Sequence, residues 1–216
     1  MTDQIKKGEG RWAYATVLVF FLSSVFCPLS SVKADGITVQ KAEARFDGES
    51  YQLSADFEIH FNAVVDQALT RGVPLYFISE FSLTRPRWYW LDEVVAQSEQ
   101  VTRLTYNALT RQYRIARGPL FQNFSSLDDA LRIIGHQSAA PIDASLFRQD
   151  DGYIAAILPN KDGDYIAAVR MRLDVTQLPK PLQVNALATE DWSLDSDWYR
   201  WIVRPSAAIS AADEKK

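Results

Sequence analysis

The stretch YQLSADFEIHF, from Tyr51 to Phe61, alternates apolar and polar residues without a break. A period of two places all its apolar side chains on one face of a β-strand. Such a strand must bury that face against a second layer of structure. The preceding stretch ITVQKAEARF, Ile37–Phe46, begins with the same alternation. The turn sequence DGES joins the two stretches, which predicts a β-hairpin.

Alternation of the same kind predicts further strands along most of the chain. They are Val73–Leu83, Arg87–Gln97, Val101–Ala108, Arg111–Arg117, Gly152–Leu158 and Asp164–Val175. The last two flank PNKDGD, in which Asp-Gly is a turn signal. Asn160, Asp162 and Asp164 superficially resemble a calcium loop. A hairpin turn is the better interpretation, because the glycine is misplaced and no glutamate stands at the twelfth position.

Two short helices interrupt the strands. The first begins at Asn62, a favoured N-cap residue, and ends at Gly72. The second lies in SSLDDALRIIG, Ser125–Gly135, which opens with a capping box. Farther on, Pro179 and Pro181 predict an extended segment rather than a helix. The pattern as a whole predicts a mainly β, antiparallel, sandwich-like domain with two short covering α-helices, and an α+β arrangement is the alternative.

The amino-terminal residues have the layout of a secretory signal. Basic residues precede the uncharged apolar run Trp12–Phe26, and SSVKA supplies the small residues that a signal peptidase reads. We therefore expect a signal peptide at residues 1–34, cleaved after Ala34, and an exported protein of the periplasm or cell envelope. The alternative is an uncleaved inner-membrane anchor formed by residues 12–32. Cleavage would remove Cys27, the only cysteine.

The remaining sequence predicts one β-rich domain over residues 35–204, followed by a disordered tail over residues 205–216 that is small, polar and charged. The chain has 23 basic and 27 acidic residues, a formal net charge of −4. This balance argues against a nucleic-acid partner. Apart from the amino-terminal run, no stretch has the composition of a membrane span, so we expect membrane contact only through that segment.

Two aromatic clusters are candidate partner-binding surfaces. In LTRPRWYWLDE, a strand would direct Trp88 and Trp90 to one face and Arg87 and Tyr89 to the other. Arg85 and Arg87 beside Tyr89 have the donors to bind a carboxylate or phosphate. The alternative is that this stretch serves packing alone.

The second cluster lies in DWSLDSDWYRW and contains Trp192, Trp198 and Trp201. Exposed tryptophans are typical of contact surfaces for proteins or carbohydrates. The alternative is that these indoles are buried. Trp198 and Trp201 are three residues apart, which one face of a regular strand does not accommodate. We therefore expect a bend or a surface position for at least one of them.

Catalytic machinery is not apparent in the sequence. His60 and His136 are the only histidines, and neither lies in a metal-binding or nucleophilic motif. We therefore predict no catalytic residues, no metal site, no cofactor and no enzymatic activity.

Several longer segments resemble a known family when they are taken in order. They are ALTRGVPLYFISEFSLTRPRWYWLDE, RLTYNALTRQYRI, FSSLDDAL, VRMRLDVTQLPKPLQVNAL and DWSLDSDW. Together they resemble an uncharacterised family of exported bacterial proteins, domain of unknown function 4390 (DUF4390). The resemblance covers nearly all of residues 37–203. It implies export, a single-domain architecture and a link to a membrane sensor kinase, and it assigns no catalytic or binding residue.

These observations favour a non-enzymatic envelope protein that binds another protein, with a membrane sensor kinase as one candidate partner. A module that binds cell-wall glycan or another small ligand is the alternative.

Overall fold

A computed structural model describes residues 36–87, 91–147 and 164–204. These residues all fall within one unit, Asp35–Lys216. Several predictions lie outside the described residues: the signal peptide, the tail, the strand at Gly152–Leu158 and nearly all of the turn that follows it.

The first sheet is built around β2, Ser50–His60. Strand β1, Gly36–Phe46, pairs with β2 in antiparallel register, so the predicted hairpin is confirmed. The carboxylate of Asp47 accepts hydrogen bonds from the backbone N–H groups of Ser50 (2.7 Å) and Glu49 (3.1 Å) in the turn. These bonds hold the pKa of Asp47 below its usual range. The short strands β7, His136–Ser138, and β8, Ile142–Asp143, pair with the other edge of β2.

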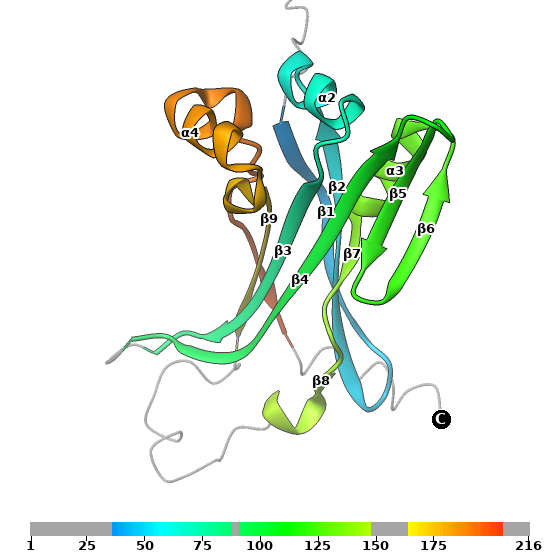
Figure 1. The fold of residues 1–216 in the computed structure, drawn as a ribbon. Coiled ribbons are helices and arrows are strands. Elements are labelled where there is room, and N and C mark those ends of the chain that lie inside the picture. The colour runs from blue at the N-terminus through cyan, green and yellow to red at the C-terminus, as the bar shows by residue number, and fades with distance from the viewer. Residues whose placement is uncertain (1–35, 88–90, 148–163, 205–216) are drawn as a thin grey trace, which may run out of the picture. The chain divides into compact units, whose positions relative to one another are not determined.

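The second sheet has six antiparallel strands in the order β10-β9-β3-β4-β5-β6 (Figure 1). Their bounds are β3 Leu75–Arg85, β4 Glu93–Asn107, β5 Gln112–Arg117, β6 Leu120–Phe124, β9 Tyr165–Leu173 and β10 Tyr199–Val203. Central strand β3 pairs with β4, which follows it directly, and with β9, which comes much later in the chain.

The inner faces of the two sheets share one hydrophobic core. Buried side chains alternate along the strands as expected for a sandwich. On β2 they are Tyr51, Leu53, Ala55, Phe57 and Ile59, on β3 they are Leu75, Phe77, Phe81 and Leu83, and on β9 they are Tyr165, Ala167, Val169, Met171 and Leu173. Each large side chain contributes about 1.5–3 kcal/mol when it leaves water. The mainly β, sandwich-like prediction is confirmed.

Both predicted helices are present. Helix α2, Ala63–Thr70, follows β2 and begins after its N-cap Asn62. Helix α3, Leu127–Gly135, packs on β2 and β5. At the end of α3, Gly135 lies directly against the backbone of Phe57. A Cβ atom at residue 135 would lie 2.1 Å from the carbonyl oxygen of Phe57, so only glycine fits this crossing.

A third helix, α4, covers Lys180–Ala188. The extended segment predicted around the two prolines is therefore wrong. Pro179 is the N-cap of α4 and Pro181 lies in its first turn. Proline is compatible with these positions, since the first amide groups of a helix have no partner within it. Short 3-10 turns lie at Ala144–Phe147, Val175–Gln177 and Glu190–Trp192.

Strand β4 corrects a second prediction. The strands expected at Arg87–Gln97 and Val101–Ala108 are one continuous strand that starts only at Glu93. The polar residues between them remain paired with β3, with Ser98 opposite Phe81 and Gln100 opposite Ser79. Strand β6 was not predicted at all.

Asn62 links α2 to a distant part of the chain and supplies a test. Its Oδ1 accepts a hydrogen bond from the N–H of Val65 (2.9 Å), and its Nδ2 donates to the carbonyl of Asp191 (2.6 Å). We expect Asn62→Ala to lower the free energy of unfolding by about 1–2 kcal/mol. Asn62→Asp keeps the oxygen that accepts from Val65 but loses the donor to Asp191, so it serves as the control in urea denaturation. Stability unchanged from the native protein in both variants would contradict the assignment.

Candidate partner-binding surface

The arginines of the first predicted cluster, Arg85 and Arg87, lie where β3 ends and β4 begins, and both pair with Glu93. The Nη1 atom of Arg85 lies 3.3 Å from the carboxylate of Glu93, and Arg87 pairs with the same carboxylate. Arg85 also donates to the hydroxyl of Tyr165 (3.1 Å) and lies over its ring. Both guanidinium groups therefore have acceptors within the chain. Tyr89 lies outside the described residues.

The three predicted tryptophans do not form a common surface. Trp192 is 2% exposed and belongs to the core. Trp201 is half-buried and packs against the core, opposite Ala167 on β9. Trp198 stacks on the guanidinium of Arg170, whose carbon lies 4.7 Å from the ring centroid. The expected bend precedes Trp198 at Asp197, whose φ is 54°.

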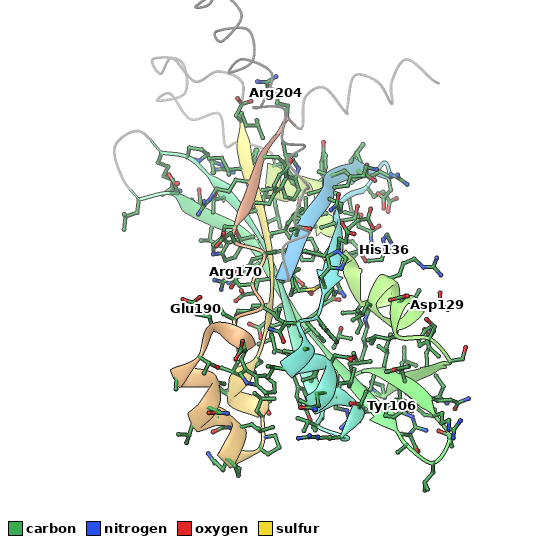
Figure 2. All side chains as sticks on the ribbon, turned by 90° about the horizontal axis from the view of Figure 1, so that it is seen from above. Tyr106, Asp129, His136, Arg170, Glu190 and Arg204 are labelled. Carbon is green, nitrogen blue, oxygen red and sulfur yellow. The ribbon has the colours of Figure 1, made fainter. Side chains whose placement is uncertain are left out.

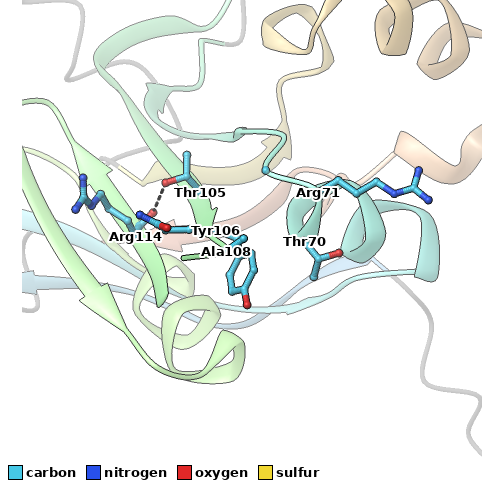
Figure 3. Close-up of a pocket in the computed structure, with 8 residues that line it drawn as sticks. Thr70, Arg71, Thr105, Tyr106, Ala108 and Arg114 are labelled. Atoms are coloured by element: carbon cyan, nitrogen blue, oxygen red, sulfur yellow. Dashed lines mark hydrogen bonds between the residues drawn. The ribbon is translucent and has the colours of Figure 1, made fainter. Parts of the chain in front are cut away.

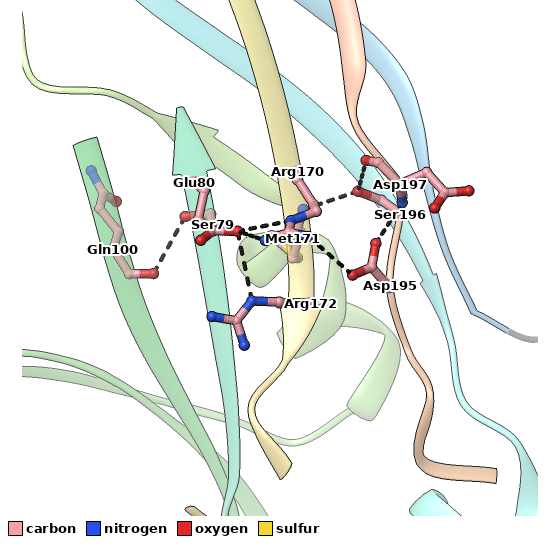
Figure 4. Close-up of polar contacts among 9 residues, drawn as sticks. All are labelled: Ser79, Glu80, Gln100, Arg170, Met171, Arg172, Asp195, Ser196 and Asp197. Carbon is pink, nitrogen blue, oxygen red and sulfur yellow. Dashed lines mark hydrogen bonds and ion pairs between the residues drawn. The ribbon is translucent and has the colours of Figure 1, made fainter. Parts of the chain in front are cut away.

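The outer face of the second sheet carries a charge network centred on Glu80 (Figure 4). Arg170 donates to one Glu80 carboxylate oxygen from Nε (2.8 Å) and Nη2 (2.6 Å), and Nε of Arg172 lies 3.6 Å from that oxygen. Asp195 lies 3.9 Å from Arg170. The Glu80 side chain is only 15% exposed. Because its charge is compensated inside the network, this cluster offers little to a ligand.

Two of the cavities lined by described residues bear on the search for a site. One of about 390 Å³ lies between the end of α2 and the β4–β5 turn (Figure 3). Its lining includes Thr70, Tyr106 and Arg114, but Arg71 points away from them. The other, of about 310 Å³, lies between β4 and the segment around β8 and is mostly apolar. Neither gathers a set of charged groups that defines a ligand.

The histidines lie on β2 and β7. Nε2 of His60 is 2.9 Å from Glu58, and Nδ1 of His136 is 2.6 Å from Asp56 on the paired strand. Figure 2 shows His136 and Arg170 on opposite sides of the sandwich. Within residues 36–87, 91–147 and 164–204, no three His, Cys, Asp or Glu side chains are grouped to hold a metal ion. In the same ranges, no helix has the length and apolar character needed to cross a membrane.

Among the described residues, strand β6 is an open sheet edge. It pairs with β5 on one side and is the last strand of its sheet (Figure 1). Its sequence LFQNF has no charged residue, its register with β5 has no bulge, and Leu120 and Phe121 are 74% and 63% exposed. Edge strands without charges or bulges readily pair with another strand.

The edge strand β1 of the other sheet is protected from such pairing. It has a register shift between Val39 and Lys41, and it carries the ion pairs Lys41–Glu43 and Arg45–Glu43. Charges and bulges of this kind prevent a further strand from adding to an edge. Of these two edge strands, β6 is the better suited to accept a partner.

The surroundings of β6 are basic. Between Glu99 and Asp128 the sequence has four arginines and no acidic residue, although the whole chain is acidic. Arg117 is directed inward, where it donates to the hydroxyl of Thr102 (3.1 Å) and to the carbonyl of Ile133 near the end of α3 (2.8 Å). Burial lowers the pKa of Arg117. The side chain stays charged, because the ordinary pKa of arginine is far above neutral pH.

Arg114 is directed outward and across β6. Its Nε donates to Oδ1 of Asn123 (3.0 Å), and its guanidinium carbon lies 5.0 Å from the ring centroid of Phe121. Arg103 is exposed on the same face, opposite Ala116 in the β4–β5 register and diagonal to Arg114. Sequence reasoning missed this site, although the acid-free run of arginines around LFQNF was a visible signal.

The described residues thus define an antiparallel β-sandwich whose edge strand β6 is uncharged, free of bulges and surrounded by basic residues. The sequence matches the model of the family named Domain of unknown function (DUF4390) over residues 34–202, and the chain belongs to that family. Comparisons with curated proteins and with solved structures found no match.

Proposed function

We propose that this chain is a non-enzymatic protein-binding module of the bacterial cell envelope, and that β6 is its contact strand. The observation that carries the proposal is the open edge of β6, which is uncharged, free of bulges and highly exposed. Proteins commonly bind extended polypeptides by adding them as a further strand to such an edge. Main-chain hydrogen bonds then provide affinity, and exposed side chains such as Leu120 and Phe121 provide contact area.

The cellular setting rests on the amino-terminal sequence. The basic residues, the apolar run and SSVKA support export to the periplasm, with an anchor at residues 12–32 as the alternative. A membrane sensor kinase is a candidate partner because the family resemblance implies a link to one. Glycan binding receives less support, since Trp192 is in the core and Trp201 packs against it.

Photo-crosslinking in intact cells tests the proposal. A photoreactive residue replaces Leu120 on β6 or, as the matched control, Ile202 on β10. Ile202 is also an exposed aliphatic residue on an edge of the same sheet, at 57% exposure. We expect one dominant protein adduct from position 120 and none from position 202, with the adducts identified by mass spectrometry.

A charge placed on the edge supplies the second part of this test. Phe121→Glu should reduce the adduct from position 120 at least about tenfold, since a charged edge residue opposes strand addition. Ile202→Glu should leave it unchanged. No adduct from position 120, or equal adducts from both positions, would contradict the proposal. So would turnover of an envelope substrate that a single substitution abolishes.

A further inference from the structure

We propose that the polypeptide bound at β6 is an acidic extended segment, with its carboxylates on the outer face of the sheet beside Arg114. This inference rests on the proposed function and specifies the chemistry of the partner. It follows from the direction of the backbone groups of β6, from the position of Arg114, and from the different side chains on the two faces.

The free N–H and C=O groups of β6 are arranged to pair with another polypeptide strand. In an antiparallel ladder, alternate residues of an edge strand bond to their neighbour, and the others direct N–H and C=O groups to the free side. A chain pairing there places its side chains alternately on the outer and inner faces. The outer face of β6 carries Phe121 and Asn123, and the inner face carries Leu120, Gln122 and Phe124.

The outer face places a positive charge over β6, next to the position of the added strand. Arg114 lies on β5, but its contacts with Phe121 and Asn123 bring the guanidinium over β6. Its Nη atoms have no hydrogen-bond acceptor in the described part of the chain, so they remain able to bind a carboxylate. Arg103 adds a second exposed cation to this face. An acidic side chain on the added strand would meet the guanidinium of Arg114, and Arg103, two strands farther from that chain than β6, would add a longer-range attraction.

The inner face is more apolar and carries charges of both signs. Arg117 lies there opposite Leu120, but its guanidinium donates to the hydroxyl of Thr102 and to the carbonyl of Ile133. Burial, Tyr106 and the carboxylates of Asp66 and Asp128 raise the pKa of Tyr113, which lies opposite Phe124 on this side. Asp129 lies next to Asp128 at the start of α3, where it pairs with Arg132. Apolar residues of the added strand can cover Phe124 and Leu120 on this face, and the carboxylates near Tyr113 disfavour acidic residues opposite Phe124. The preferred strand therefore alternates acidic and apolar residues.

Binding of synthetic peptides to the purified protein tests this inference by fluorescence anisotropy at low salt. The probes are labelled ten-residue peptides of alternating glutamate and valine, of alternating lysine and valine, and of the acidic sequence interrupted by a central proline. We expect the acidic peptide to bind at least about tenfold more tightly than the lysine peptide. The interrupted peptide should not bind, because proline removes a donor and the extended pairing.

Variants of Arg114 separate charge from local structure. Arg114→Gln should weaken binding of the acidic peptide about fivefold, while Arg114→Lys should keep most of it, since the charge remains. Arg200→Gln is the matched control. Arg200 is exposed on β10, at the opposite edge of the same sheet, and its loss should change nothing. Thermal unfolding of each variant checks that the fold is intact.

The possible results distinguish this inference from the proposed function. Equal affinity for the acidic and lysine peptides would overturn the acidic preference, and a partner adduct from position 120 would still support strand addition. Acidic-peptide binding that Arg114→Gln leaves unchanged would also overturn the inference. If vesicles containing phosphatidylglycerol bind in an Arg114-dependent manner and no peptide does, the site is a membrane-binding surface and the inference fails.

Discussion

Replacing Gly135 by alanine is expected to lower the free energy of unfolding by about 3 kcal/mol or more, because overpacking against backbone is costly to relieve. The new Cβ would lie 2.1 Å from the carbonyl oxygen of Phe57. That oxygen belongs to β2, so the clash can be relieved only by moving α3 away from the sheet. Such a shift would disturb the buried residues Ala130, Leu131 and Ile134. Urea denaturation followed by circular dichroism measures the loss.

Gly72→Ala is the control for this substitution. Gly72 has φ of 89°, and a Cβ atom there would have no neighbour within 4 Å. Its replacement measures backbone strain alone, which we expect to cost about 1–2 kcal/mol. If Gly135→Ala cost no more than Gly72→Ala, close contact between α3 and β2 would not contribute to stability.

Removing the charge of Glu80 is expected to cost about 2 kcal/mol, since it leaves Arg170 and Arg172 without their shared acceptor. The largely buried carboxylate accepts both hydrogen bonds from Arg170. In Glu80→Gln a neutral amide replaces the carboxylate. The guanidinium groups of Arg170 and Arg172, which lie two residues apart on the same face of β9, then repel each other. The cost is smaller than for a fully buried pair because the arginines are partly exposed.

Glu99→Gln provides the matched control. Glu99 is exposed on β4 and lies directly opposite Glu80 in the β3–β4 register. Like charges opposite each other are unfavourable, so we expect this change to be neutral or to stabilise by up to about 0.5 kcal/mol. Both variants are compared by urea denaturation at low and high salt. Equal effects of the two substitutions would show that the network contributes no specific stability.

Much of the fold was predictable because its strands follow local rules. The alternation in β2 identified the buried row from Tyr51 to Ile59, and Asn62 marked the start of α2. The errors arose where tertiary context decides. Pro179 and Pro181 are compatible with both an extended segment and the first turn of a helix. The polar residues Ser98 and Gln100 suggested a break in β4, but pairing with β3 keeps them in the strand.

The candidate site was less predictable, since exposure depends on the complete fold. Trp192 and Trp201 have the composition of a binding surface, yet both pack with the core. Arg85 and Arg87 were expected to bind an external anion, and the register places Glu93 opposite Arg85. Strand β6 was missed because LFQNF shows no clear alternation. Its importance comes from being last in the sheet, which is a property of topology.

The position of β3 also determines the order in which the domain can assemble. Its pairing with β4 involves neighbouring parts of the chain, whereas its pairing with β9 joins Phe77 to Leu173. Contacts so distant in sequence require closure of a long loop before they return free energy, which slows folding. During synthesis, one edge of the central strand therefore stays unpaired until β9 emerges. An unpaired strand edge can pair with other chains, so the stage before β9 docks is the one most exposed to aggregation.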